Sequence, residues 1–227
     1  MPLHSAVHAG DIKAVKICLE FGSNISSQQH DLSTPLHLAC SQGAIEIVKL
    51  MLSNSSQDNT SLLTIPDAQQ MTPIHCASMF DHADLCDYLC SLEMASGILE
   101  TEDKDGRTVL LLASARAAWK CVSVLIKRHA KIDHIDSYNR NLLHHIVMNG
   151  GDVNYFNGQV YAATEDEQTF LGLLNQVSWK CLNVSSAAAF LGKVRYLDRC
   201  PLTLPIPKTR RMFSGALRCT MRPGRAT

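Results

Sequence analysis

The stretch Thr34–Leu52, TPLHLACSQGAIEIVKLML, decides the fold of this 227-residue chain. Thr34 offers a side-chain oxygen to the first amides of a helix, and Pro35 suits the first helical position, where its missing N–H would be unpaired anyway. Gly43 permits a sharp reversal, after which the apolar run Val48–Leu52 predicts a second helix. Neither short helix buries its apolar face alone, so the stretch predicts a helical hairpin that stacks on similar neighbours.

The same pattern recurs along the chain, which predicts a repeat protein. The last position of the four-residue anchor falls at residues 4, 37, 75, 111 and 144, so successive repeats are spaced by 33, 38, 36 and 33 residues. These spacings bracket the period of about 33 residues of ankyrin repeats. We therefore predict an all-α ankyrin-repeat solenoid of helical hairpins, followed by a poorly ordered tail. The anchors given a structural role are Pro2, His4, Thr34, Pro35, His37, Thr72, Pro73, His75, Thr108 and His144.

Charge is divided unevenly along the chain. The 21 Lys and Arg cancel the 21 Asp and Glu, but residues 1–150 hold 11 basic and 16 acidic side chains, and residues 151–227 hold 10 and 5. The balanced total disfavours nucleic acid as a partner. The change in composition predicts a boundary near residue 150. We place an ankyrin array of four to five repeats, the first and last incomplete, at 1–150, and a divergent, partly disordered basic tail at 151–227.

The sequence argues against export and against a membrane span. It contains no run of about 18 apolar residues, and its first residues lack the basic start and apolar run of a secretory signal. Its nine cysteines include no CxxC pair, so we expect reduced thiols, most of them in the core. These features predict a cytoplasmic chain.

Two residue pairs have spacings that zinc ligands can use. His37 with Cys40, and Cys86 with Cys90, could each place two ligands on one helix face. A structural interpretation is favoured, because His37 is an anchor and the cysteines occupy positions that repeats fill with small or medium apolar residues. No four-ligand cluster with zinc-finger spacing exists in the sequence. We therefore predict no metal and no cofactor.

Enzyme activity is not expected either. His75 and Cys76 are adjacent, but neighbours on a helix point in different directions and do not make a catalytic dyad. The pair His144–His145 combines an anchor with a neighbouring helix position, and pH sensing is a minor alternative there. The sequence contains no phosphate-binding glycine loop, nucleophile elbow or HExxH motif.

Several stretches resemble the amino-terminal ankyrin array of transient receptor potential ankyrin (TRPA) cation channels. Ser78–His82, where most ankyrin repeats carry a glycine turn, and Trp119 in the atypical fourth repeat point to this family rather than to a generic ankyrin protein. The resemblance covers about the first two-thirds of the chain. The stretches that carry it are Gln28–Met51, Met71–Leu89, Arg107–Ile126 and Arg140–Gly151.

The resemblance implies a fragment of a large tetrameric, calcium-permeable sensory channel, in which a cytosolic ankyrin array precedes six membrane helices. In such a channel the array would bind protein partners and other channel subunits at the cytosolic face of the plasma membrane, assist assembly and transmit gating strain. We expect no pore in this chain. The alternative is a free-standing cytosolic ankyrin adaptor that binds protein partners.

Ankyrin arrays bind partners with the loops between repeats, because loops on a rigid scaffold carry specificity. The loop Glu100–Asp105 is rich in carboxylates and favours a basic partner segment, with a solvated acidic turn as the simpler alternative. The longer second spacing places a polar insertion at residues 54–61, which we expect to be exposed and mobile. The candidate partner-binding residues are Asp31, Asn54, Asp67, Glu102, Asp103 and Asp136.

Overall fold

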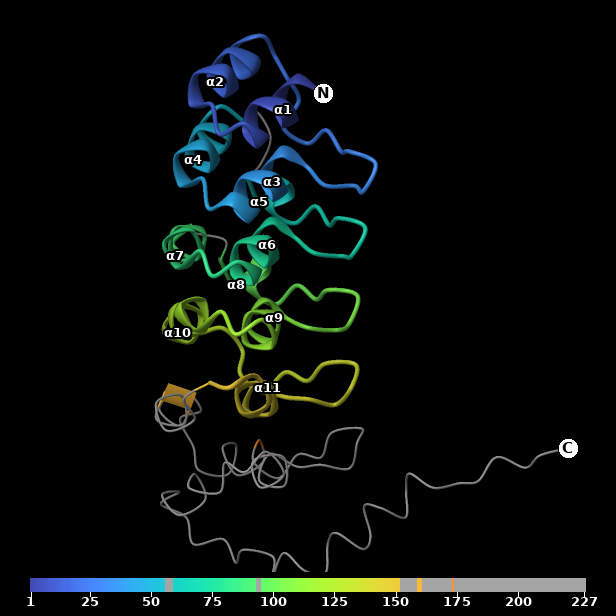
Figure 1. Cartoon of the computed structure of the whole chain (residues 1–227), viewed down its shortest axis with the longest axis vertical. Helices are drawn as coiled ribbons and strands as arrows, with labels where there is room; N and C mark the ends of the chain where they lie inside the picture. The colour runs from blue at the N-terminus through green and yellow to red at the C-terminus, as the bar shows by residue number, and fades with distance from the viewer. Residues whose placement is uncertain (56–58, 93–94, 152–158, 161–172, 174–227) are drawn as a thin grey trace, which may run out of the picture.

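The computed structural model describes residues 1–55, 59–92, 95–151, 159–160 and 173, so most of the predicted tail at 151–227 lies outside the described residues. Helical hairpins stack in chain order into an elongated solenoid, with first helices in one column, second helices in another, and finger-like loops projecting beyond the first helices (Figure 1). The predicted all-α repeat fold is confirmed. The hairpins are α1 (Pro2–His8) with α2 (Ile12–Glu20), α3 (Pro35–Gln42) with α4 (Ile45–Ser53), α6 (Pro73–Met79) with α7 (Ala83–Cys90), and α9 (Val109–Ala115) with α10 (Trp119–Lys127), followed by α11 (Leu142–Asn149).

Two further short helices occupy links between repeats: α5 (Asn59–Leu63) and α8 (Ala95–Leu99). In α5, Leu62 and Leu63 are buried in the core. The polar insertion expected at residues 54–61 therefore ends in a packed helix rather than a wholly exposed loop, because the two leucines that follow it anchor the segment. Residues 56–58 of the insertion lie outside the described part of the chain.

The core lies between the two columns of helices and runs continuously from repeat to repeat. The first helices carry a buried alanine two residues after the anchor, at Ala39, Ala77 and Ala113, which lets neighbouring helices approach closely. Six cysteines among the described residues are free thiols, and all but Cys18 are buried. Burial raises the pKa of the Cys76 thiol to about 12, so this thiol stays neutral.

Each hairpin turn adopts the same left-handed conformation, whatever residue occupies it. Gly10, Gly43, Asp81 and Ala117, all six residues after the anchor, have φ of 67°, 69°, 59° and 58°. Only glycine adopts this conformation without strain, so the repeat fold imposes it on Asp81 and Ala117. The helical boundaries are thus fixed by the stacking of repeats as well as by local sequence.

Polar side chains near these turns tie the second, third and fifth repeats to the repeat before each of them. Gln42 Nε2 donates to the His8 carbonyl at 3.1 Å, His82 Nε2 to the Ser41 carbonyl at 2.9 Å, and Asn149 Nδ2 to the Ser114 carbonyl at 3.2 Å. The accepting carbonyls lie at the ends of first helices, where they lack partners within their own helix. These bonds fix the register between neighbouring hairpins. None of the helices in the described ranges is long and apolar enough to cross a membrane.

Candidate functional site

The finger loops are the candidate binding surface, and one aspartate closes each of the second, third and fourth fingers. In the second finger, Asp67 Oδ1 accepts from the N–H groups of Gln69 and Met71 at 2.7 and 2.9 Å. The same carboxylate position recurs in the third and fourth fingers, where Asp103 and Asp136 each accept two backbone N–H groups at 2.9 Å. Short polar side chains that bond backbone two residues on stabilise tight turns in this way. The aspartates therefore shape the fingers.

Asp103 and Asp136 were expected to face partners, and the structure corrects that expectation. Their residues are only 3% and 2% exposed. The guanidinium of Arg107 contacts Asp103 Oδ2 at 2.8 Å, and that of Arg140 contacts Asp136 Oδ2 at 2.7 Å. Each arginine stands four residues after its aspartate, and the ion pair between them holds the carboxylate within the finger. Both oxygens of each carboxylate are thus engaged within the finger.

The remaining candidate residues are more accessible. Asp31 and Glu102 are exposed at the fingers, and Asp67 is half-buried. Glu102 lies 3.5 Å from His134 Nε2, with its side chain 54% exposed. Asn54 does not join this group, because it sits at the end of α4 and its amide donates to the Leu50 carbonyl at 2.8 Å. The fingers therefore collect Asp31, Asp67 and Glu102 on one side of the solenoid but not Asn54.

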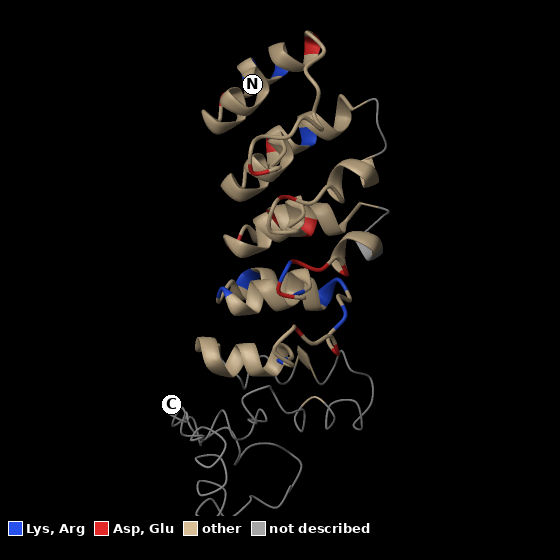
Figure 2. Cartoon of the chain, turned by 90° about the vertical axis from the view of Figure 1, so that its right-hand side faces the viewer, with Lys and Arg blue, Asp and Glu red and all other residues tan. Residues whose placement is uncertain are grey.

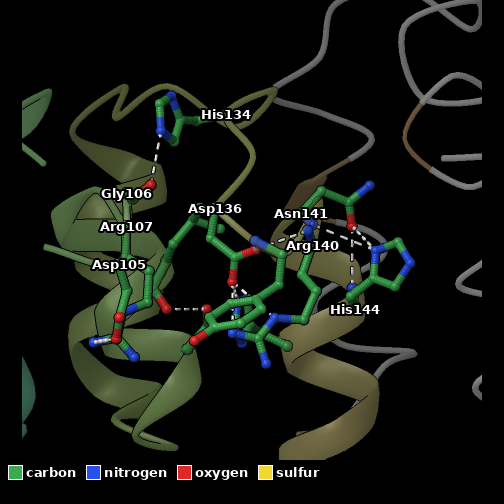
Figure 3. Close-up of polar contacts among 12 residues, drawn as sticks. Asp105, Gly106, Arg107, His134, Asp136, Arg140, Asn141 and His144 are labelled. Carbon is green, nitrogen blue, oxygen red and sulfur yellow. Dashed lines mark hydrogen bonds and ion pairs between the residues drawn. The ribbon is translucent and has the colours of Figure 1, made fainter. Parts of the chain in front are cut away.

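Backbone hydrogen bonds connect the fingers into one continuous edge. The N–H of Ala68 donates to the Asp31 carbonyl at 3.0 Å, Lys104 to Gln69 at 3.1 Å, and Ser137 to Asp105 at 2.9 Å. In Figure 3, His134 Nε2 also reaches the Gly106 carbonyl, at 3.1 Å. A partner would meet this edge as a preorganised surface, which lowers the ordering cost of binding.

The anchor histidines form a second set of bonds between repeats, which we call the histidine ladder. His4 Nε2 faces the Ser33 carbonyl at 3.3 Å, His37 Nε2 the Met71 carbonyl at 2.9 Å, and His75 Nε2 the Arg107 carbonyl at 3.4 Å. A carbonyl only accepts, so each ring donates from Nε2. Each accepting carbonyl belongs to the residue just before the threonine that opens the next repeat's first helix. The ladder therefore joins each first helix to the finger that follows it.

The other ring nitrogen fixes the protonation state of these histidines. Nδ1 of His37 accepts from the Thr34 N–H at 3.1 Å and lies 2.9 Å from the Thr34 hydroxyl. His75 and Thr72 repeat this arrangement at 3.2 and 2.9 Å. An Nδ1 that accepts a backbone N–H cannot carry a proton, so the rings are neutral. Burial lowers the pKa of His37 and lowers that of His75 to about 4. Both ring nitrogens of His37 are engaged in hydrogen bonds within the protein.

The fourth repeat interrupts the ladder. Leu111 stands where the other repeats carry histidine, and the buried Thr108 hydroxyl has no hydrogen-bond partner among the described residues. In the fifth repeat Asn141 replaces threonine, and its Oδ1 lies 2.8 Å from His144 Nδ1 (Figure 3). The sequence pattern placed all these anchors, but it did not indicate which of them would be hydrogen-bonded.

Sequence reasoning missed the buried contact of His145. Its Nε2 lies 3.1 Å from Asp136 Oδ2, and the side chains are 2% and 0% exposed. Burial acts to raise the pKa of Asp136, but hydrogen bonds from His145 and Arg140 hold that pKa well below its ordinary value. One signal was available: at the position of His145 two other repeats hold Leu38 and Leu112, and a histidine in such an apolar position needs a polar partner.

The repeat geometry and the sequence agree on the class of this protein. The family model of ankyrin repeats, in three copies, matches residues 3–99. Residues 3–99 are therefore ankyrin repeats, and the hairpin α9–α10 and helix α11 continue the same repeat geometry.

Among curated relatives, the chain is 50% identical over 199 residues, or 87% of its length, to transient receptor potential cation channel subfamily A member 1 of Drosophila melanogaster. It is 40% identical over 183 residues to the Homo sapiens channel of the same name, a match that covers 63% of the chain. Rabankyrin-5 of Homo sapiens is 30% identical over 170 residues, covering 74% of the chain and 14% of Rabankyrin-5. The repeats thus correspond to part of the amino-terminal ankyrin region of TRPA channels, and the chain spans 16% of the length of the two channel subunits. The Drosophila match is longer than residues 1–150 and so extends past the predicted boundary.

Proposed function

We propose that residues 1–150 act, within a full-length TRPA-type calcium-permeable cation channel, as a cytosolic module for protein interaction, subunit assembly and transmission of gating strain. The observation that carries this proposal is the 50% identity to the Drosophila channel over most of the chain. The chain spans only a small part of the relatives it matches. The activity of the whole channel is therefore inferred from its identity to the Drosophila channel.

The contacts between repeats support a role in transmission. Each junction between neighbouring hairpins combines core packing with hydrogen bonds at the fingers and at the turns, such as His37 to Met71 on one side and His82 to Ser41 on the other. A solenoid joined in this way on both sides resists shear between repeats. Displacement of one end is then passed to the other through rigid, packed elements.

The fingers support a role in binding partners. Asp31, Asp67 and Glu102 lie along this edge, and the Glu100 and Glu102 side chains of the third finger favour a basic segment. The third finger is partly neutralised from within, since Asp105 contacts Arg107 at 2.8 Å and Glu100 accepts the Lys131 N–H at 3.0 Å. Glu102 is therefore the third-finger carboxylate most available to a partner. Asp31 is exposed at the first finger, where its Oδ1 accepts from the N–H and the hydroxyl of Ser33.

A chimeric channel tests the proposal. The segment of the Drosophila channel that matches residues 1–150 is replaced by this chain's segment, and surface expression and calcium-permeable currents are measured. We expect assembled, gated channels, and we expect Asp31→Lys with Glu102→Lys to change partner binding without reducing surface expression. Chimeras that fold but neither assemble nor conduct would overturn the proposed role.

A free-standing ankyrin adaptor is the alternative, and the match to Rabankyrin-5 at 30% identity supports it. It is the weaker one, because the Drosophila channel is 50% identical. The chimera separates the two functions. An adaptor has no requirement to support gating, whereas a channel module must restore current in place of the native segment.

A further inference from the structure

The outer face of α10 carries an unbalanced positive charge. Residues 106–132 contain six Lys and Arg and no Asp or Glu. Two of these six, Arg107 in the third finger and Arg128 at the end of α10, pair with aspartates outside this range. Most of the Lys and Arg drawn in Figure 2 lie at the level of α9 and α10. Asp and Glu predominate in the preceding repeat, at the level of α6 and α7. Soluble surfaces usually intersperse the two signs, and a segregated patch attracts a partner of opposite charge.

Two lysines of α10 point directly away from the core. Cys121, Val122, Leu125 and Ile126 form the buried side of the helix. Lys120 and Lys127 share one face of the helix, because seven residues make almost two full turns. That face is opposite the buried side, and both lysines are exposed. Between them on the same face stand Ser123 and Val124, which are half-buried. The outer stripe of α10, Lys120–Ser123–Val124–Lys127, therefore has a small, partly apolar centre between two cations about 10 Å apart along the axis.

In each of the first two repeats, a lysine at the repeat position of Ser123 is paired within its own helix. In α2, Lys16 lies 3.9 Å from Glu20, and in α4, Lys49 lies 3.0 Å from Glu46. Neither Lys120 nor Lys127 has an ion pair with any residue in the described part of the chain, and both are exposed. Lys13 of α2, at the repeat position of Lys120, is also exposed and has no ion pair with a described residue, so what distinguishes α10 is that it carries two such lysines seven residues apart.

The neighbouring helix shows what chemistry suits this face. The outward side of α7 carries Asp84 and Asp87, and Asp87 Oδ1 accepts from Arg128 Nε at 2.8 Å across the two repeats. An acidic helix thus already pairs with the basic end of α10 on one side. The same aspartates disfavour a flat anionic membrane, because a plane that touched Lys120 and Lys127 would also approach Asp84 and Asp87.

We propose that the outer stripe of α10 docks an acidic amphipathic helix of a partner protein. Two carboxylates seven residues apart on that helix meet Lys120 and Lys127, because both helices have the same rise per residue. Apolar side chains between the carboxylates cover Val124. The inference rests on the protein-interaction role proposed above but concerns a surface other than the fingers.

The test uses the full chain and a fluorescein-labelled, alanine-rich peptide of about 18 residues with two glutamates seven apart and leucines between them. Fluorescence anisotropy measures binding at low salt and at about 0.15 M salt, where screening weakens exposed pairs. We expect Lys120→Glu with Lys127→Glu to weaken binding by at least about tenfold. The matched variant Lys13→Glu with Lys16→Glu, on the outer face of α2, is expected to bind as the unaltered chain does.

Three outcomes would overturn the proposal: no binding at low salt by the unaltered chain, equal loss in both double variants, or equal binding of a peptide with lysines in place of glutamates. Preferential binding to phosphatidylserine vesicles, or salt-sensitive self-association through Asp84 in sedimentation, would assign the stripe to a membrane or to a second copy and also overturn it. Circular dichroism shows that each variant is folded. Failure here leaves the chimera test of the fingers and of channel assembly unaffected.

Discussion

Asp81 Oδ1 accepts a hydrogen bond from the backbone N–H of Cys121 at 3.0 Å, although forty residues separate them. Cys121 is the third residue of α10, and Ala118, which precedes that helix, has no capping side chain. The preceding repeat therefore supplies the N-terminal cap of α10. α10 thus takes its N-terminal capping group from the preceding repeat, whereas α2 and α11 are capped by their own N-cap residues, Asp11 and Asn141.

Replacement of Asp81 is expected to destabilise the array. Asp81→Ala removes the cap and places alanine at a φ of 59°, so we expect a loss of about 1–2 kcal/mol in the free energy of unfolding. Asp81→Asn keeps an acceptor and tolerates the left-handed conformation, so its effect should be smaller. Urea unfolding of both variants checks this. An alanine variant as stable as the unaltered chain would show that the contact contributes nothing.

Two threonines at equivalent anchors should respond in opposite ways to the same substitution. The Thr72 hydroxyl lies 2.9 Å from His75 Nδ1, whereas the buried Thr108 hydroxyl has no hydrogen-bond partner in the part of the chain that the structure describes. Valine has the shape of threonine without the hydroxyl. We expect Thr72→Val to cost about 1 kcal/mol and Thr108→Val to be neutral or stabilising, because an unsatisfied buried group is removed. Thermal unfolding of the pair measures the difference, and a larger loss at Thr108 would contradict it.

Gly10 and Gly43 form a second matched pair. Their φ values are nearly equal, at 67° and 69°, but a Cβ at Gly43 would lie 2.5 Å from His82 Nδ1, whereas nothing lies within 4 Å of one at Gly10. Alanine at either site incurs the cost of the left-handed conformation, about 1–2 kcal/mol. Gly43→Ala should cost about 1–3 kcal/mol more, since His82 must move. Equal effects in urea unfolding would mean that the His82 contact with Ser41 adapts freely.

The sequence was sufficient for the repeat fold but not for the orientation of its charged residues. Anchor spacing predicted the repeat positions of Thr34 and His37, because the start of the first helix follows from a local pattern. The buried position of the Asp103 and Asp136 carboxylates depends on an arginine four residues later in each finger. The count of charged residues does not show this pairing. The Asp81 cap was beyond sequence reasoning, since it joins residues that only stacking brings together.

Protonation of the buried histidines links stability to pH. Burial lowers the pKa of His4, His37 and His145 and lowers that of His75 to about 4. Unfolded histidine titrates near pH 6.5, so below that value the unfolded chain binds protons that the native chain excludes. Stability therefore rises with pH through this range. Asp136 acts in a separate window: its depressed pKa adds stability that is present above about pH 4 and lost at lower pH.

The free energy of unfolding should thus be highest above about pH 7 and should fall steadily between about pH 6.5 and 4.5. Urea unfolding across this range measures the slope, which should correspond to uptake of more than one proton. His75→Gln removes the histidine with the most depressed pKa, so the variant should be less stable at neutral pH and show a shallower slope. His30→Gln, at an exposed position, is the control and should leave the slope unchanged. A slope that His75→Gln does not alter would show that the ladder histidine is not the source of the pH dependence.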